Sequence, residues 1–466
     1  MKTPISLWMD DPAIQSQARP RLESNLSVDV AIIGAGFTGL WTAYYLKKHN
    51  PSLTIAIVEA EYAGFGASGR NGGWLIGGLM GEDQLLSTLP EDERRNKRQL
   101  LFSIPDEVAA VLHQEQIDCH YRKGGVIYAA ARYSEQEVRL RQWLDELYHT
   151  GCTEADFAWL APEALSDKVN VSQGLGAIYS PHCATIQPAR LVQGLAEAVE
   201  RLGVTIYELS PVTDWQPGRL TTSAGQVEAQ WIVPAVEGYA TSLSTLGRYQ
   251  IPVQSMIVAT APIGEAIWQS IGLHQGEAFA DNSRMVTYAQ RTKDNRLVFG
   301  TRGGYRFGSR LRHDFQLSAQ EVAERRTLLE ALFPVLKNIE LTHGWGGNLG
   351  MARAFQPHML CDEENGIALA GGYGGEGVGA SNLAGRTLAE LITGQTTQLT
   401  EQPWVIKGSA SRHLRRWEPE PLRWLGYRLI LAALSREEVV LSNLETSQWR
   451  RRLAVVLSDQ LEKLMD

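Results

Sequence analysis

The stretch that decides the fold is VDVAIIGAGFTG, residues 28–39. Its first half, 28–33, is apolar and β-branched and too short for a helix, so it predicts a buried strand. A glycine turn of the form GxGxxG follows at once, and residues 40–48 then have helical character. A second apolar run, 55–58, predicts another strand. Strand, glycine turn, helix and strand in this order predict a dinucleotide-binding βαβ unit.

Each glycine of the turn has its own physical role. Gly34 permits the tight turn, and Gly36 lets the backbone approach a pyrophosphate. Gly39 lets the helix pack against the strand, and the helix N-terminus offers free N–H groups to the phosphates. Glu59, twenty residues after Gly39, ends the second strand and can accept hydrogen bonds from ribose hydroxyls. A plain structural turn in another α/β protein is the alternative.

Two further glycine-rich loops stand out. Residues 63–73, AGFGASGRNGG, have neither helical nor strand periodicity, so their backbone is expected to lie close to a ligand. Near the other end, 371–377 read GGYGGEG between an apolar strand, 367–370, and a helical run, 378–393. This second loop therefore presents another helix N-terminus, unless it is a simple strand-turn-helix crossing.

These motifs together are similar to those of the D-amino-acid oxidase superfamily of FAD enzymes, which includes sarcosine, glycine and γ-glutamylputrescine oxidases. The matching pieces are DVAIIGAGFTGLWTAYYL, IVEA, GASGRNGG and, from 366 to 392, GIALAGGYGGEGVGASNLAGRTLAELI. The resemblance covers roughly residues 5–395. With its long tail, the overall pattern most resembles the aminophosphonate oxidoreductase branch.

The resemblance implies FAD as cofactor, with a helix N-terminus facing the pyrimidine ring of the flavin. Branches that bond the flavin covalently use a cysteine where this chain has Met351, or a histidine where it has Arg70, so we expect non-covalent FAD. The implied FAD contacts come from five segments: Gly34, Gly36, Phe37, Thr38 and Gly39; Glu59 and Ala60; Ala67, Ser68, Gly69, Arg70, Asn71, Gly72 and Gly73; Val212, against adenine; and Gly374, Gly375, Gly377 and Val378.

The expected fold is α/β: a Rossmann-like FAD domain with an inserted α+β substrate domain built on an antiparallel sheet. Two helices have clear signals, one after Gln187-Pro188 that ends before Gly203, and one opened by the capping-box pair Ser318 and Glu321. The expected segments are 1–81, 152–245 and 340–400 for the FAD domain, 82–151 and 246–339 for the substrate domain, and 401–466 for a helical extension.

Composition narrows the function further. A net charge of −8 argues against nucleic-acid binding, and four widely spaced cysteines form neither a disulfide framework nor a metal site. The proline-broken start (Pro4, Pro12, Pro20) has no signal-peptide core, and no run is apolar enough to span a membrane, so we expect a cytoplasmic protein. Both amphipathic stretches of the tail, HLRRWEPEPLRWLGYRLI and WRRRLAVVLSDQLEKLM, carry acids among their arginines. We therefore expect helices packed on the domains rather than a membrane association.

The resemblance implies oxidative deamination of a small-molecule amine or amino acid. Flavin accepts hydride from the carbon bearing nitrogen, the imine hydrolyses, and oxygen is reduced to peroxide. Glu376, Trp345 and Tyr373 are the catalytic candidates. Glu376 is unusual because the family frequently has histidine there, and Trp74 and Arg353 are expected near the substrate. The alternatives are a dehydrogenase that passes electrons to a quinone, a hydroxy-acid oxidoreductase, and a non-catalytic flavoprotein.

A local excess of positive charge lies within residues 284–312, where seven arginines and one lysine face a single acid. If the chain is extended at 301–306, Arg302 and Arg306 point to one face. With Arg353 they would form a fork for a carboxylate or phosphonate, because guanidinium groups bind such anions in a bidentate manner. A solvated basic surface is the alternative.

Overall fold

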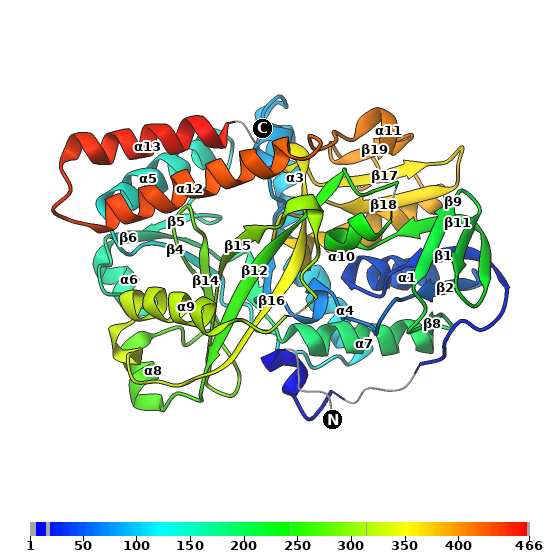
Figure 1. The fold of residues 1–466 in the computed structure, drawn as a ribbon, viewed down its shortest axis with the longest axis horizontal. Helices are drawn as coiled ribbons and strands as arrows, with labels where there is room; N and C mark the ends of the chain where they lie inside the picture. The colour runs from blue at the N-terminus through cyan, green and yellow to red at the C-terminus, as the bar shows by residue number, and fades with distance from the viewer. Residues whose placement is uncertain (1–5, 15–18, 244, 314, 464–466) are drawn as a thin grey trace.

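The computed structural model describes residues 6–14, 19–243, 245–313 and 315–463. Pro4 and the last residues of the second amphipathic stretch, Leu464 and Met465, lie outside these ranges. Two domains lie side by side, each built on one large sheet, and a pair of C-terminal helices lies on the second domain (Figure 1).

The first domain contains a nine-stranded sheet in the order β19-β17-β18-β11-β1-β2-β8, with the β9–β10 hairpin attached to β11. Its centre is the expected unit, in which β1 pairs in parallel with β2 on one side and β11 on the other. The strands are β1 (Leu26–Ile33), β2 (Ile55–Val58), β8 (Thr205–Tyr207), β9 (Val212–Gln216), β10 (Arg219–Thr222), β11 (Gln226–Pro234), β17 (His358–Asp362), β18 (Ile367–Gly371) and β19 (Val405–Lys407).

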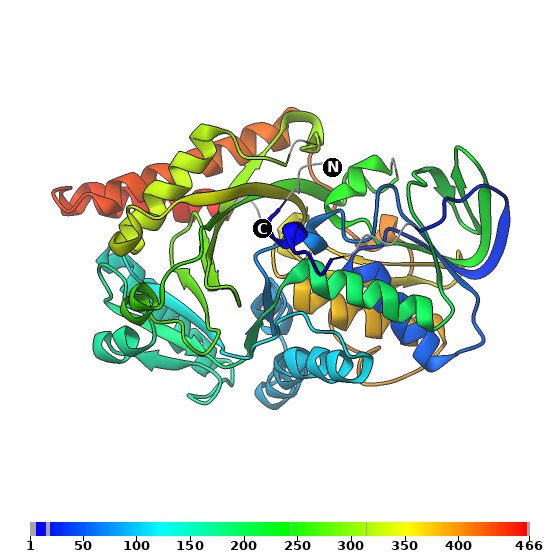
Figure 2. The same cartoon turned by 90° about the horizontal axis from the view of Figure 1, so that it is seen from below.

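Helices cover this sheet (Figure 2). At the crossing of α1 and α10, a Cβ on Gly385 would lie 2.5 Å from the Cβ of Trp41, so only glycine permits this approach. Buried apolar residues of all these helices share one core with β1 and β2. The helices are α1 (Phe37–His49), α3 (Glu91–Phe102), α4 (Ile104–Glu115), α7 (Pro188–Arg201) and α10 (Gly377–Ile392).

The second domain contains an eight-stranded sheet in the order β16-β12-β15-β14-β13-β4-β6-β5. Its pairs are antiparallel except β13 with β4, which is parallel. The strands are β4 (Val126–Ala130), β5 (Ala158–Leu160), β6 (Gly176–Ser180), β12 (Gln250–Thr260), β13 (Ala278–Asp281), β14 (Thr287–Arg291), β15 (Leu297–Tyr305) and β16 (Leu341–Ala352). The helices are α5 (Ser134–His149), α6 (Pro162–Lys168), α8 (Glu265–Ile271) and α9 (Ala319–Leu332).

Shorter elements join the domains and end the chain. β3 (Trp74–Ile76) pairs with β7 (Cys183–Thr185) between the two sheets. The others are η1 (Leu7–Asp10), η2 (Ala67–Gly69), α2 (Glu82–Leu86), η3 (Glu237–Ser242), η4 (Phe307–Ser309), η5 (Pro334–Leu336), η6 (Arg353–Phe355), α11 (Ala410–His413), α12 (Leu422–Ser442) and α13 (Gln448–Glu462). In the described part of the chain, no helix combines the length and apolarity that a membrane crossing needs.

The expected fold class is confirmed, and so are the two helices with clear signals. Pro188 is the first residue of α7, and Gly203 follows the helix with a φ of 89°. The side chains of Ser318 and Glu321 form the reciprocal capping box at the start of α9. β8, directly after α7, pairs with β2 and extends the first sheet.

The domain boundaries differ from the sequence expectation. Residues 158–180 and 341–352, expected in the first domain, supply β5, β6 and β16 of the second sheet. Residues within 91–115, expected in the second domain, pack in the core of the first domain. Residues 405–407, expected in the helical extension, form the edge strand β19 of the first sheet. The reason is physical: a short apolar run indicates a strand, but its partner is chosen by long-range pairing that no local pattern records.

Candidate active site

The first glycine turn leaves the N-terminus of α1 open. Gly36 is the N-cap residue and makes no side-chain cap, and Gly34 has a φ of 104° that favours glycine. A Cβ on Gly39 would lie 2.2 Å from the carbonyl oxygen of Gly34, so this position is closed to any side chain. The Phe37 N–H donates to Ser68 Oγ at 2.8 Å, which ties the turn to the second loop.

Glu59 lies at the end of β2 and its carboxylate turns toward the glycine turn. It accepts hydrogen bonds from the N–H groups of Ala35 at 2.7 Å and Glu61 at 3.0 Å. Burial raises the pKa of this carboxyl. Val212, the residue implied against adenine, begins β9 and packs at the edge of the first domain's core.

The loop 63–73 is held by its own side chains. Asn71 accepts from the Gly73 N–H at 2.7 Å and donates to the carbonyls of Ala67 and Ser68. Arg70 is buried between two rings, with its guanidinium carbon 4.5 Å from the centre of Phe65 and 3.4 Å from that of Phe315, and burial lowers its pKa.

The end of this loop meets the second domain through glycines. A Cβ on Gly72 would lie 2.5 Å from the Tyr288 ring, and the amide of Gln290 donates to the Gly72 carbonyl at 2.7 Å. The Tyr288 ring also packs edge-on against Trp74, whose indole N–H donates to the Ala289 carbonyl at 3.2 Å. Trp74 thus lies at the seam between the domains.

The loop 371–377 presents the N-terminus of α10, where the N-cap residue Glu376 makes no side-chain cap. Gly375 has a φ of 123°, and a Cβ placed on it would meet nothing within 4 Å, so the space beside it is open. Tyr373 Oη lies 3.0 Å from Thr38 Oγ1 in the first turn of α1. The two open helix N-termini therefore lie at one site.

Glu237 holds this loop by hydrogen bonds. Its carboxylate accepts hydrogen bonds from the N–H groups of Gly372 and Tyr373, both at 3.2 Å, and also from Gly350 of β16. Burial raises the pKa of Glu237 to about 7. The residue follows β11 and is the first residue of η3.

These residues fit FAD. Helix N-termini without side-chain caps are suited to a pyrophosphate and to negative charge on a ring. Gly36 and Gly375 leave backbone surfaces that a side chain would fill, and Glu59 offers a carboxylate at the end of β2.

A group of acids lies beside the α10 N-terminus. The turn before α2 brings Glu82 and Asp83 there, with Met80 against Gly374. Burial raises the pKa of Glu376 to about 7, and nearby Asp83 adds to the effect. Burial likewise raises the pKa of Glu82 to about 8, although its carboxylate accepts from the Leu79 N–H at 2.8 Å.

Three of these residues were missed by the sequence interpretation. Glu82, Glu237 and Tyr288 belong to no motif, and each reaches the site through a long-range contact. Glycine density around 77–81 is the one local signal that a backbone passes closely there.

Two of the three catalytic candidates are engaged in packing. Trp345 is fully buried, its indole N–H donates to the Arg70 carbonyl at 2.8 Å, and it meets Trp8 edge-on. Tyr373 is buried with its hydroxyl against Thr38. Among the described residues, Glu376 has no hydrogen bond from its side chain to another group, so its carboxylate is the one available for a substrate.

The arginines of 284–312 lie mostly in ion pairs. Arg284 binds Glu437, Asp459 and Glu462 of the C-terminal helices, and others pair with acids of the second domain. The local excess in sequence is therefore largely neutralised by ion pairs, and for Arg284 the partners lie in the C-terminal helices.

The three residues of the expected fork have different surroundings. Arg306 is exposed just after β15, and Arg353 pairs with Glu418 at 3.2 Å and lies over the Trp417 ring. Arg302 lines a crevice of about 10 Å³, room for one water, with Met351 and α12. In the described residues, no ion pair or hydrogen bond engages its guanidinium.

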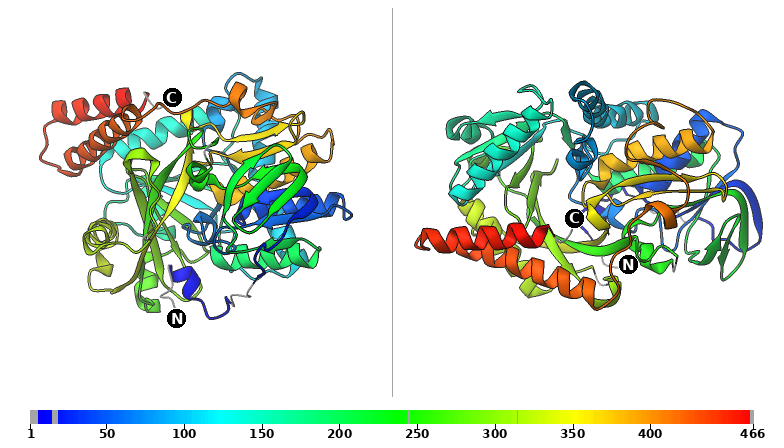
Figure 3. Two further views of the ribbon diagram at one scale, coloured as in Figure 1. Left: turned by 45° about the vertical axis from the view of Figure 1, so that its right-hand side comes forward. Right: turned by 90° about the horizontal axis from the view of Figure 1, so that it is seen from above.

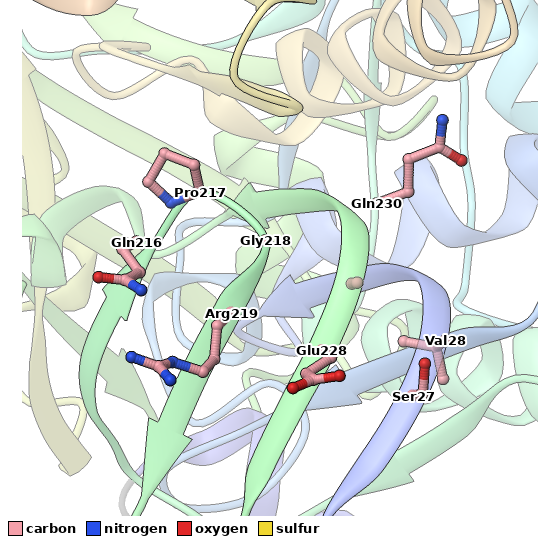
Figure 4. A pocket seen from close by; sticks show the side chains of 9 residues that line it. Ser27, Val28, Gln216, Pro217, Gly218, Arg219, Glu228 and Gln230 are labelled. Atoms are coloured by element: carbon pink, nitrogen blue, oxygen red, sulfur yellow. The ribbon is translucent and has the colours of Figure 1, made fainter.

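A separate depression of about 380 Å³ lies between the β9–β10 hairpin and the starts of β1 and β11 (Figure 4). Ser27, Arg219 and Glu228 are among its lining residues. Ligands of open α/β sheets bind at the carboxyl ends of the strands, where the glycine turns lie. This depression is at the opposite ends of β1 and β11, so we assign it no role in the site.

Comparison with known proteins agrees with this geometry. The sequence matches the family described as "DAO: FAD dependent oxidoreductase" over residues 29–391. It is 29% identical to the probable oxidoreductase OrdL of Haemophilus influenzae, over 82% of this chain and 86% of the relative. It is also 29% identical to the gamma-glutamylputrescine oxidoreductase of Escherichia coli, over 80% of this chain and 85% of the relative.

The fold is similar to that of a solved glycine oxidase from Geobacillus kaustophilus. The TM-score is 0.67 at 22% sequence identity, covering 82% of this chain and 98% of that structure. At this identity the likeness concerns the fold alone.

Proposed function

The chain belongs to the DAO family of FAD-dependent oxidoreductases, and from this premise we propose that it oxidises the C–N bond of an amine or amino acid. The similarity to a gamma-glutamylputrescine oxidoreductase supports an amine substrate. The observation that carries the proposal is Glu376, a carboxylate without a partner in the described residues, at the open N-terminus of α10.

Glu376 and its neighbours are suited to an amine. An alkylamine arrives as an ammonium ion, and carboxylates at the site attract it. The amine must lose a proton before the C–H bond can break, and a carboxyl with a pKa of about 7 accepts that proton near neutral pH. Glu82 adds a second acidic group close by. We therefore assign Glu376 the roles of binding the ammonium ion and receiving its proton.

When bound, FAD supplies a two-electron acceptor for the hydride that leaves the carbon. The protein holds the amine with this C–H bond directed at the ring, and Trp74 and Tyr288 form the wall at the domain seam. The imine product hydrolyses in water to a carbonyl compound and ammonia or an amine. We propose oxygen as the final acceptor, with peroxide as its product.

We assign Arg302 the role of binding a second, anionic group of the substrate. Gly300 and Arg302 lie on the same face of β15, and a Cβ on Gly300 would meet the Tyr288 ring. Tyr288 in turn contacts Gly72, so Arg302 lies on the face directed at the flavin loop. An unpaired guanidinium on this face supports a substrate with a carboxylate or phosphonate, as in the aminophosphonate branch. The crevice beside it is too narrow for such a group, so the anion would bind at its mouth.

An anaerobic screen tests this function. The FAD-loaded protein is mixed with panels of amines, amino acids, aminophosphonates and matching hydroxy acids, and bleaching of the flavin absorbance is followed. We expect bleaching with an amine that carries an anionic group, and equimolar ammonia or amine product after air is admitted. Bleaching by hydroxy acids alone would replace C–N oxidation with C–O oxidation.

The electron acceptor is tested in the same reactions. We expect one peroxide per amine oxidised in air. Turnover with a soluble quinone and no peroxide would assign the protein to the dehydrogenases. A protein that retains FAD and is bleached by none of the panels would be a non-catalytic flavoprotein.

A further inference from the structure

The outer side of α12 carries large apolar residues that nothing in the described chain covers. Leu422, Leu425, Leu429 and Val439 are each more than half exposed. Leu425, Leu429 and Val439 recur at helical spacing on the side opposite Tyr427 and Leu434, which are buried. Exposed residues of this size normally occur singly, so several of them on one side of a helix indicate a binding surface.

The same pattern continues on α13. Trp449, Leu453, Val456 and Leu457 are each at least half exposed and follow one side of the helix. The opposite side faces the second domain, where Ser458 is buried and Arg451 pairs with Glu135 of α5 at 2.6 Å. Eight of the fifteen large apolar side chains with high exposure in the described chain therefore lie on these two helices.

The acids of both helices are bound by arginines of the second domain. Glu437 has no exposed side-chain surface and pairs with Arg139 at 2.9 Å, and Glu438 pairs with Arg132 at 2.9 Å. On α13, Asp459 and Glu462 both bind Arg284. These pairs fix the two helices to the second domain and neutralise their acids, of which Asp459 and Glu462 keep 46% and 36% of their side chains exposed.

The outward charges are basic. Arg428 and Arg436 on α12 and Arg450, Arg452 and Lys463 on α13 and just after it are exposed. In the described residues 422–463, the one exposed acid is Glu445, in the link between the helices. The exposed charges of these two helices are thus predominantly basic in a chain whose net charge is −8.

The two helices form one elongated surface. They lie side by side along the edge of the second domain (Figure 3). α12 has 21 residues, which corresponds to a length of about 32 Å. We call the exposed stripes of α12 and α13, with their flanking basic residues, the outer face. It lies in a segment beyond the family match, which ends at residue 391.

We propose that the outer face docks on the surface of an anionic lipid bilayer, with both helices lying in the interface. Apolar side chains between arginines, with a tryptophan among them, are the pattern that inserts at the headgroup boundary while the cations stay with anionic lipid. The argument for lipid over a second copy is charge. Two copies would oppose basic surfaces, whereas anionic headgroups complement them.

Vesicle binding of the FAD-loaded full chain tests this proposal. We expect it to sediment with phosphatidylglycerol–phosphatidylethanolamine vesicles, at least tenfold less with phosphatidylcholine vesicles, and progressively less as salt rises from about 0.1 to 0.5 M. The double variants Leu453→Ser/Val456→Ser and Arg450→Glu/Arg452→Glu should each lose at least tenfold of this binding. Their flavin content and melting temperature show whether they fold.

Matched controls keep the result specific. Val335→Ser and Arg219→Glu change an exposed apolar and an exposed basic residue elsewhere, and should bind vesicles as the wild type does. Brominated lipid should quench part of the tryptophan fluorescence, and Trp449→Phe should remove that part while retaining binding. No binding to anionic vesicles, quenching unchanged in Trp449→Phe, or a dimer that the double variants dissociate would overturn the proposal.

Discussion

The carboxylate of Glu237 accepts a hydrogen bond from the Tyr373 N–H at 3.2 Å. This contact joins the end of β11 to the glycine-rich loop that opens α10, two segments that are 136 residues apart. Through Tyr373, whose hydroxyl reaches Thr38, Glu237 is connected to the first turn of α1 as well. One half-buried acid is thus linked by hydrogen bonds to both helix N-termini that fit FAD.

Removing this acid should loosen the site. Glu237→Ala leaves three backbone N–H groups without their acceptor, which should cost roughly 2–4 kcal/mol of stability in the FAD-free protein. FAD should bind at least about tenfold more weakly, since about 1.4 kcal/mol corresponds to a factor of ten. Glu237→Gln keeps one acceptor oxygen, so its stability and its FAD affinity should lie between those of the wild type and of Glu237→Ala. Urea unfolding and flavin fluorescence titration measure both effects, with the exposed Glu363→Ala as control. Unchanged FAD affinity in Glu237→Ala would contradict the role of this acid.

The glycine turn makes a separate prediction. Gly36→Val should abolish FAD binding, because a Cβ there lies 3.0 Å from Ser68 Oγ and the side chain occupies the surface open to a pyrophosphate. The ratio of flavin absorbance to protein measures the loss. Gly304→Ala, where a Cβ meets nothing within 4 Å, is the matched control and should keep a full complement. A yellow Gly36→Val protein would mean that the motif serves another purpose.

The flavin should leave the chain on acid precipitation. Met351 occupies the position of the linking cysteine, and it is buried against the C-terminal extension, with its carbonyl accepting from the Trp417 indole N–H at 2.8 Å. Arg70 occupies the position of the linking histidine. Absorbance of the supernatant after trichloroacetic acid measures release, and yellow colour retained in the washed pellet would show a covalent bond at another residue.

The first domain was predictable because its signals are local. The glycine turns need particular backbone conformations at fixed spacing, and the proline signal at the start of α7 acts within one helical turn. The acids at the site were not predictable in the same way. Glu82 lies near Glu376 because the chain folds back at residues 77–81, which read GGLMG. No sequence pattern near either residue encodes that approach.

The charges of the C-terminal extension also depend on long-range contacts that no local sequence pattern predicts. In sequence, the acids among the arginines of the tail indicate a solvated helix. In the structure, Glu437 and Glu438 turn inward to arginines of the second domain, which leaves Arg436 outside. Hydrophobic periodicity indicates which side of a helix is buried, but the partners of buried acids come from residues about 150–300 positions away.

The pKa of Glu82 gives a pH dependence of stability. This carboxyl has a pKa of about 8 in the folded protein, raised by burial above its ordinary value of 4.5. The folded state therefore binds more protons between these values, and stability falls as pH rises from about 4.5 to 8. The destabilisation by charged Glu82 is therefore absent below about pH 4.5 and complete above about pH 8.

The variant Glu82→Gln should remove that dependence. A neutral amide replaces the protonated acid, so the variant should match the wild type near pH 5 and exceed it near pH 8.5 by roughly 1–3 kcal/mol. Urea midpoints at both pH values measure the difference, with Glu163→Gln on the exposed face of α6 as control. A difference that does not change with pH would show that Glu82 acts through packing alone.

Arg302 distinguishes an anionic substrate from an uncharged one. Its guanidinium has no partner in the described chain, whereas Arg353 is engaged by Glu418 and Trp417. Arg302→Ala should therefore lower kcat/KM for an anionic amine by roughly 1.5–3 kcal/mol, because a charged hydrogen-bond partner is lost, and should barely change kcat/KM for the matching uncharged amine.

Arg353 should respond differently, because its loss removes the ion pair with Glu418 and the contact with the Trp417 ring rather than a contact with the anion. Arg353→Ala should lower kcat/KM for both amines by a similar factor, and the exposed Arg310→Ala should change neither. The ratio of kcat/KM for the anionic amine to kcat/KM for the uncharged amine isolates the anion contact, because effects on folding or FAD loading cancel in this ratio. If Arg302→Ala leaves this ratio unchanged, Arg302 does not hold the anion. If the ratio falls only in Arg353→Ala, the anion binds on the side of η6 and the salt bridge to Glu418 must open for it.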